Sequence, residues 1–142
     1  MLRGKTLPAR LVPAHAAFEQ QATRVESARR ALLSCLPVGR VNPAPVPVGL
    51  DLLRDELHAV RAQLTRWRVP QMSGEWEGCR AAIEESLEAM LTAHRVAQSS
   101  TELEELLGAV GDVIEPLDAW ADAERAWRGL RVRAARVRPA EG

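Results

Sequence analysis

The chain has 142 residues, enough for one domain with a hydrophobic core, and its 19 basic and 19 acidic residues give a net charge of zero. This balance argues against a dedicated nucleic-acid-binding domain, whose surface is usually basic throughout. No stretch approaches the roughly 18 apolar residues of a membrane span, and no apolar run follows the basic N-terminus as it would in a secretory signal. We therefore expect a cytoplasmic protein, with the nucleus as an alternative.

The apolar residues are mainly Ala, Leu and Val, with one Phe and no Tyr, so good helix formers dominate over strand-forming aromatics. Charge is unevenly distributed along the chain. Residues 75–124 carry a formal charge of −11, whereas residues 125–142 carry +5. All but one of the 19 basic residues are arginine, which either a high-GC genome or selection for bidentate contacts to carboxylates and phosphates would explain.

The N-terminal third is expected to hold an arm, a helix and a linker. Residues 1–12 are basic and broken by glycine and proline, and we interpret them as an N-terminal arm. The first helix is expected to begin near Pro13, which suits a first helical turn, and to end at Leu36, before a proline. Residues 37–48 contain four prolines and predict an extended, polyproline-like strap to the second helix.

The strongest pattern in the chain is a repeat of apolar residues that alternate in steps of 3 and 4. It predicts a helix over residues 49–67 that buries one narrow seam against other helices. We interpret this helix as the internal strut against which the later helices fold. The seam residues are Leu50, Leu53, Leu57, Val60, Leu64 and Trp67.

Two further helices are expected to carry seams of the same kind. The third is expected to run from Ser73, a good N-cap, to about Ala97, and the fourth to run through Trp127. Glycine costs about 1 kcal/mol and proline about 3 kcal/mol inside a helix. Gly111 and Pro116 therefore predict either one helix kinked near these residues or two helices nearly in line.

Together these elements predict an all-α fold, an antiparallel bundle of four helices, or five if the last is divided, with coiled-coil-like seams and short basic tails. The bundle domain is expected to cover residues 13–130, including the strap. Residues 131–142 lose the apolar pattern, and we interpret them as an Arg-rich tail that frays.

The basic C-terminal segment is the candidate partner-binding site. Arginine interleaved with tryptophan suits phosphate contact and base stacking, and tryptophan is a common interface anchor. The alternatives are a cationic helix end favoured by the helix dipole, pairing with the chain's own acidic third helix, an acidic protein partner, and core packing of the tryptophans. The candidate residues are Trp120, Trp127, Arg125, Arg128, Arg131, Arg133, Arg136 and Arg138.

Residues suited to catalysis or metal binding do not form a complete motif. Asp55 and His58 give a single Asp-x-x-His step, less than half of what a di-metal bundle requires. Cys35 and Cys79 fall on or beside apolar faces without a nucleophile motif, and we interpret them as small buried hydrophobes. We therefore expect no enzyme activity, no metal, no cofactor and no small-molecule substrate.

The functional hypothesis is a non-catalytic helical adaptor or structural subunit that mediates protein–protein interaction or oligomer assembly through helix faces. Segregated charge supports it, because complementary charge orients a partner or another copy of the chain. The alternative is nucleic-acid binding through the Arg-rich C-terminal segment, which would depend strongly on salt.

Overall fold

The computed structural model describes residues 7–36, 45–99 and 102–137, with side chains as far as Arg131. The α-helices of this part of the chain are α1 (Val12–Ser34), α2 (Val46–Arg61), α3 (Ser73–Ser99), α4 (Leu103–Ile114) and α5 (Ala119–Val137). Short 3-10 helices are η2 (Ala9–Leu11), η3 (Leu64–Trp67), η4 (Pro70–Met72) and η5 (Glu115–Asp118).

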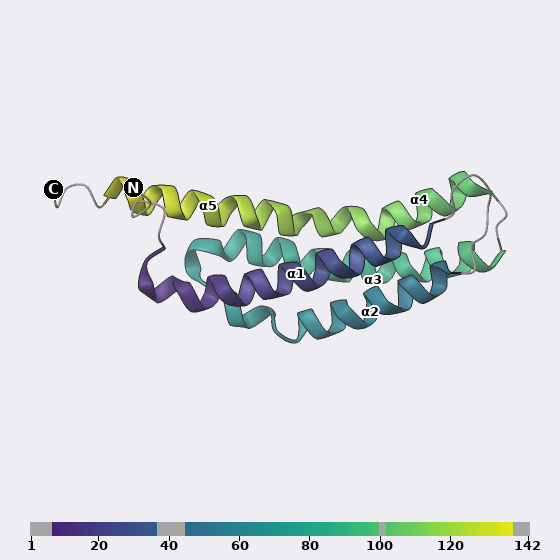
Figure 1. The fold of residues 1–142 in the computed structure, drawn as a ribbon, viewed down its shortest axis with the longest axis horizontal. Helices are drawn as coiled ribbons and strands as arrows, with labels where there is room; N and C mark the ends of the chain where they lie inside the picture. Colours follow the sequence, from purple (N-terminus) through teal and green to yellow (C-terminus); the bar gives the residue numbers. More distant parts are fainter. Residues whose placement is uncertain (1–6, 37–44, 100–101, 138–142) are drawn as a thin grey trace.

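The helices form an elongated antiparallel bundle, which confirms the predicted all-α fold (Figure 1). α3 is central because it packs against α2, α4 and α5, while α1 packs against α2. Contacts at the two ends of α2 show its direction: Arg61 pairs with Glu84 of α3 at 3.2 Å, and Asp51 lies 3.0 Å from His94. α4, η5 and α5 run nearly in line and are called the α4–α5 rod (residues 103–137).

The seam predicted over residues 50–67 is buried along its whole length, since none of its six side chains is more than 3% exposed. The prediction of one continuous helix is wrong. α2 ends at Arg61, and the last part of the seam lies in the 3-10 helix η3. Leu64 and Trp67 are three residues apart, which is one turn of a 3-10 helix, so both side chains still face the core.

Side chains from other helices hold the corner after α2. The amide of Gln21, which is 1% exposed, donates to the Gln63 carbonyl at 2.8 Å and accepts from the Trp67 indole at 3.0 Å. Trp76 of α3 donates its indole N–H to the Leu64 carbonyl at 2.9 Å. A buried polar group left without a partner costs about 1–3 kcal/mol. These hydrogen bonds therefore fix the corner to α1 on one side and to α3 on the other.

The interruption predicted near Gly111–Pro116 is present, in the form of two helices nearly in line (Figure 1). Pro116 has no N–H to continue the α-helical hydrogen bonding, and η5 replaces the α-helix there. The buried hydroxyl of Ser86 in α3 donates to the Val113 carbonyl at 2.7 Å, in the last turn of α4. This hydrogen bond from α3 therefore supports the rod beside the point where Pro116 interrupts the rod's helical hydrogen bonding.

The second helix begins earlier than predicted. α2 starts at Val46, inside the segment predicted to be an extended strap, and Pro47 occupies its first turn. A proline is compatible with that position because the first N–H groups of a helix have no helical acceptor. Residues 37–44 of the strap lie outside the described residues.

The two ends of the described chain also extend the bundle. α5 continues to Val137. Residues 131–137, which were predicted to fray, are therefore helical. Leu7 and Leu11 of the predicted N-terminal arm are buried in the core. Residues 1–6 of the arm lie outside the described residues.

Substitution of Leu57 tests whether the seam is the core. Leu57 is 0% exposed, so Leu57→Asp places an unpaired carboxylate in an apolar interior. We expect the cooperative thermal transition, followed by circular dichroism, to be lost, because the penalty removes most of a typical stability of about 5–15 kcal/mol. Leu52→Asp is the matched control, since Leu52 on the same helix is 55% exposed. A wild-type melt for Leu57→Asp would contradict a buried seam.

Gly49 permits a close approach between α2 and the C-terminal end of α1. A Cβ at this position would lie 3.0 Å from Cys35 Sγ and 3.2 Å from Leu32 Cα. We expect Gly49→Ala to lower the free energy of unfolding by about 1–3 kcal/mol in urea titrations, because the helices must separate. The control is Gly78→Ala in α3, where an added Cβ meets nothing within 4 Å. There alanine should stabilise by about 0.5–1 kcal/mol, and an equal gain at Gly49 would contradict the close packing.

Candidate interaction surface on α4 and α5

The α4–α5 rod reverses its charge along its length. Residues 103–124 contain seven carboxylates and no basic residue, whereas residues 125–137 contain five arginines and no carboxylate. Helix dipoles favour carboxylates near the N-terminal ends of α4 and α5 and cations near the C-terminal end of α5. The rod therefore has an acidic part, formed by α4, η5 and the first turns of α5, and a basic part formed by the rest of α5.

Arg125 and Arg128 lie on the outer surface of the rod, with side chains that are 66% and 68% exposed. Arg125 pairs with Asp122, and Arg128 lies 3.7 Å from Glu124. These carboxylates come from α5 itself rather than from the acidic helix α3, which was one of the alternatives. Exposed pairs of this kind contribute little to stability, so the guanidinium groups stay accessible to a partner.

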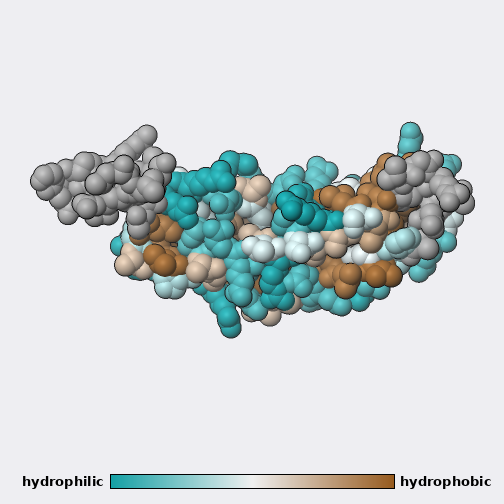
Figure 2. Space-filling model, viewed as in Figure 1, coloured by the Kyte–Doolittle hydropathy of each residue, from teal (hydrophilic) through white to brown (hydrophobic). Residues whose placement is uncertain are grey.

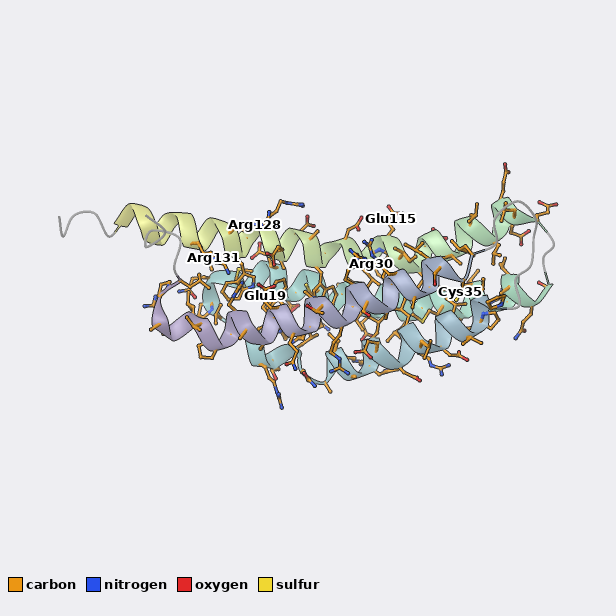
Figure 3. All side chains as sticks on the ribbon, viewed as in Figure 1. Glu19, Arg30, Cys35, Glu115, Arg128 and Arg131 are labelled. Atoms are coloured by element: carbon orange, nitrogen blue, oxygen red, sulfur yellow. The ribbon has the colours of Figure 1, made fainter. Side chains whose placement is uncertain are left out.

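Arg131 turns toward α1 instead (Figure 3). Its Nη2 lies 3.0 Å from His15 Nε2, and Glu19 lies 3.5 Å from the same nitrogen. Burial lowers the pKa of His15, the Arg131 cation lowers it further, and Glu19 and Glu124 act in the opposite direction. The His15 ring is therefore neutral near pH 7, and it can accept a hydrogen bond from Arg131.

The two tryptophans predicted as partner anchors lie inside the bundle, so that assignment is corrected. Trp120 is 5% exposed and Trp127 is 0% exposed. The Trp127 ring meets His15 in a T-shaped contact at 5.0 Å between ring centroids and lies 6.1 Å from Phe18. Packing against α1 removes from solvent the ring faces that a partner or a nucleic-acid base would contact.

The structure describes only the backbone, or nothing, of the three remaining predicted arginines. Arg133 and Arg136 belong to the last turns of α5, where the backbone alone is described, and Arg138 lies outside the described residues. Among the predicted arginines whose side chains are described, Arg125 and Arg128 are exposed to solvent, whereas Arg131 is directed toward α1.

Two exposed carboxylates on the acidic part, Asp112 and Glu115, were not among the predicted site residues. Figure 3 shows Glu115 and Arg128 on the same outer edge of the rod, away from α1. The surroundings of Gly108 and Gly111 in this part of the rod are not crowded, because an added Cβ would meet nothing within 4 Å. The acidic run was visible in the sequence, but the packing of the rod on α3 determines which carboxylates face outward.

An open groove of about 200 Å³ lies between α1 and the rod, with a mainly apolar floor and a charged rim. On the rim, Arg29 donates to Glu26 at 3.0 Å and lies 3.7 Å from Asp118 of η5. The hydrogen bond from Arg29 lowers the pKa of Glu26. The rim carboxylate is therefore ionised and paired. The apolar lining residues are Ala22, Val25, Leu117, Trp120 and Ala121.

The face drawn in Figure 2 is mostly polar, and its apolar side chains gather at two places, near the start of α1 and where α1 ends and α2 begins. Val48 and Leu52, one helical turn apart on α2, are 60% and 55% exposed. Leu33, near the end of α1, is 43% exposed. These side chains form the apolar group at the end of α1 and the start of α2.

Both cysteines are free thiols that are at least partly buried among other side chains. Cys79 is 0% exposed, burial raises the pKa of its thiol to about 12, and its Sγ lies 3.8 Å from the Ala119 carbonyl. Cys35 is half-buried and donates to the Ala31 carbonyl at 3.3 Å. Over the described ranges, no group of three or more His, Cys, Asp or Glu residues could hold a metal ion, and no helix combines the length and apolar character needed to cross a bilayer.

The lowered pKa of His15 predicts a pH dependence of stability. The unfolded chain binds a proton at His15 more readily than the folded one, so this contribution is complete above about pH 6.5 and is lost as the pH falls through the folded pKa. We expect urea unfolding at about pH 7.5 and about pH 5 to show acid destabilisation that is smaller in His15→Gln. His58→Gln, at an exposed histidine, is the control, and equal pH dependence in wild type and His15→Gln would contradict the prediction.

Comparison with known proteins finds no matching family model, no similar curated protein and no similar solved structure.

Proposed function

We propose that the protein is a non-catalytic helical subunit that associates with a protein partner through the outer face of the α4–α5 rod. The observation that carries this proposal is the charge reversal on that face, where Asp112 and Glu115 lie on the acidic part and Arg125 and Arg128 on the basic part. A surface with the two signs in succession favours one orientation of a partner, because the reverse orientation juxtaposes like charges.

The internal packing supports the same proposal. The core is formed by apolar seams that face inward, and Arg125 and Arg128 have carboxylate partners only one turn away on the same helix. These charges therefore contribute little to holding the helices together. A surface whose charge pattern is not required for folding is available for recognition.

Nucleic-acid binding through the Arg-rich segment is the alternative proposal, and it has less support. Arg125 and Arg128 are exposed enough to contact phosphates. The buried Trp127 offers no face for base stacking, and the carboxylates beside both arginines repel a phosphate. Salt-sensitive binding of a DNA or RNA oligonucleotide that is lost in Arg125→Glu/Arg128→Glu would favour this alternative.

The proposed function is tested by the size of the native complex. A tagged full-length chain, expressed in the organism that encodes it, should elute well above its monomer mass of 15.6 kDa. Arg125→Glu/Arg128→Glu should shift the elution to the monomer position. The matched control is Arg54→Glu/Arg80→Glu, which makes the same charge change at exposed arginines that also pair within their own helices. Elution of the wild-type chain as a monomer would overturn the proposal.

A further inference from the structure

We propose that the end of the bundle where α1 begins and α5 ends binds an acidic segment of the partner protein. This inference rests on the function proposed above and names the chemistry of that partner. The surface is called the basic end and comprises residues 7–19, 62–77 and 125–137, which contain eight arginines and three glutamates. Figure 1 shows the start of α1 and the end of α5 at the same end of the bundle. The arginines are Arg10, Arg66, Arg68, Arg125, Arg128, Arg131, Arg133 and Arg136.

Contacts between aromatic rings bring the three segments of the basic end together. Phe18 of α1 lies 5.3 Å from Trp67 of η3 and 6.1 Å from Trp127 of α5, measured between ring centroids. All three rings are fully buried. Trp67 lies between two arginines in the sequence, and Trp127 is followed directly by a third. Those three arginines are exposed, so a buried aromatic cluster holds segments that carry cations at the surface.

Arginines without a carboxylate partner are concentrated at the basic end. Among the thirteen arginines with described side chains, eight form an ion pair with a carboxylate. Of the other five, only Arg95 lies outside the basic end. Arg68 lies over the Trp76 ring, 4.5 Å from its centroid, and Arg131 contacts His15. The four at the basic end are Arg10, Arg66, Arg68 and Arg131.

The three glutamates of the basic end leave this positive charge largely uncompensated. Glu77 pairs with Arg80, which lies outside the basic end, and Glu19 lies against His15. Glu75 is in the first turn of α3, where it compensates the positive end of the helix dipole. The basic end therefore has more cations than the bundle itself neutralises.

Like charges gathered at one end repel one another and destabilise the folded chain, and an anionic ligand would remove that repulsion. A guanidinium has five N–H donors in a planar fork that matches the two oxygens of a carboxylate. Within the described residues, the guanidinium groups of Arg10 and Arg66 have no hydrogen-bond or ion-pair partner, and both side chains are exposed. All of their donors are therefore available to a carboxylate of another protein.

The basic end suits protein carboxylates better than a nucleic acid or a bilayer. Proteins that bind single-stranded nucleic acids stack bases on exposed aromatic side chains, whereas the four tryptophans and the phenylalanine of this chain are all buried. Insertion into a bilayer requires exposed apolar side chains. Val12 is the one large apolar side chain that is exposed among those described at the basic end. Charge is what this surface offers a partner, and a segment rich in Asp and Glu complements it.

Binding of an acidic peptide to the purified full-length protein tests this inference. The probe is a fluorescein-labelled oligoglutamate peptide, followed by fluorescence anisotropy at about 20 mM salt, where exposed charges are weakly screened. We expect the wild-type protein to bind it, with an affinity that falls steeply as salt is raised. Arg10→Glu/Arg66→Glu should weaken binding at least about tenfold, because two cations of the basic end become anions. Circular dichroism melts establish that this variant is folded, since neither side chain has a described partner to lose.

Arg54→Glu/Arg95→Glu is the matched control. It makes the same change in net charge at two exposed arginines near the other end of the bundle, where Asp51 of α2 meets His94 of α3. The control should bind the peptide like the wild-type protein. Equal weakening in both variants would show that net charge alone governs binding, and it would overturn a site at the basic end.

Two further probes decide the class of partner. They are an oligodeoxythymidine of the same charge as the peptide, and vesicles of phosphatidylserine and phosphatidylcholine. Peptide binding at least as tight as binding of either probe supports a protein partner. Tighter binding of the oligonucleotide would assign the basic end to nucleic acid, and tighter binding of the vesicles would assign it to an anionic membrane. Either result would overturn the inference, as would a wild-type protein that does not bind the peptide at low salt.

The native complex separates this inference from the function proposed above. Arg10→Glu/Arg66→Glu should shift the elution of the tagged chain to the monomer position, as Arg125→Glu/Arg128→Glu should. A native complex that persists in the first variant and is lost in the second would overturn the acidic-segment inference, and the proposed function would stand. A wild-type chain that elutes as a monomer would overturn both.

Discussion

The rest of the bundle depends on the buried hydrogen bonds around Gln21. This side chain joins α1 to the corner after α2 by accepting from Trp67 and donating to the Gln63 carbonyl. Trp76 ties the same corner to α3. Because the Gln63 and Leu64 carbonyls accept hydrogen bonds from side chains, they stay hydrogen-bonded where the chain leaves the α-helix after Arg61. That departure turns the chain toward α3 and allows α3 to become the central helix.

A similar compensation operates in the α4–α5 rod. Pro116 interrupts the helical hydrogen bonds, and Ser86 of α3 donates to the Val113 carbonyl beside the interruption. Because η5 keeps the two helices nearly in line, the charges of α4 and α5 lie along one continuous surface (Figure 1). An angled joint would have separated the acidic part from the basic part. The interruption and its support by α3 thus determine the shape of the candidate interaction surface.

Much of the fold could be predicted from residue spacing alone, because the steps of 3 and 4 between apolar residues identify helices and their buried faces. The candidate site was predicted less completely. Trp127 and Arg128 are sequence neighbours in a basic segment, yet one is buried against Phe18 and the other is exposed. Whether a side chain of α5 is buried or exposed depends on which face of the helix packs against α1. That choice is made by contacts with residues far away in the sequence.

The sequence by itself determined the all-α class, the burial of the seam from Leu50 to Trp67 and the reversal of charge near residue 125, because these follow from residue types and their periodicity. Only the tertiary structure decided where α2 ends, that Arg131 meets His15, and that Asp112 and Glu115 share an exposed rod with Arg125. The reason is physical. Such features arise from contacts between segments distant along the chain, and local periodicity carries no information about which segments meet.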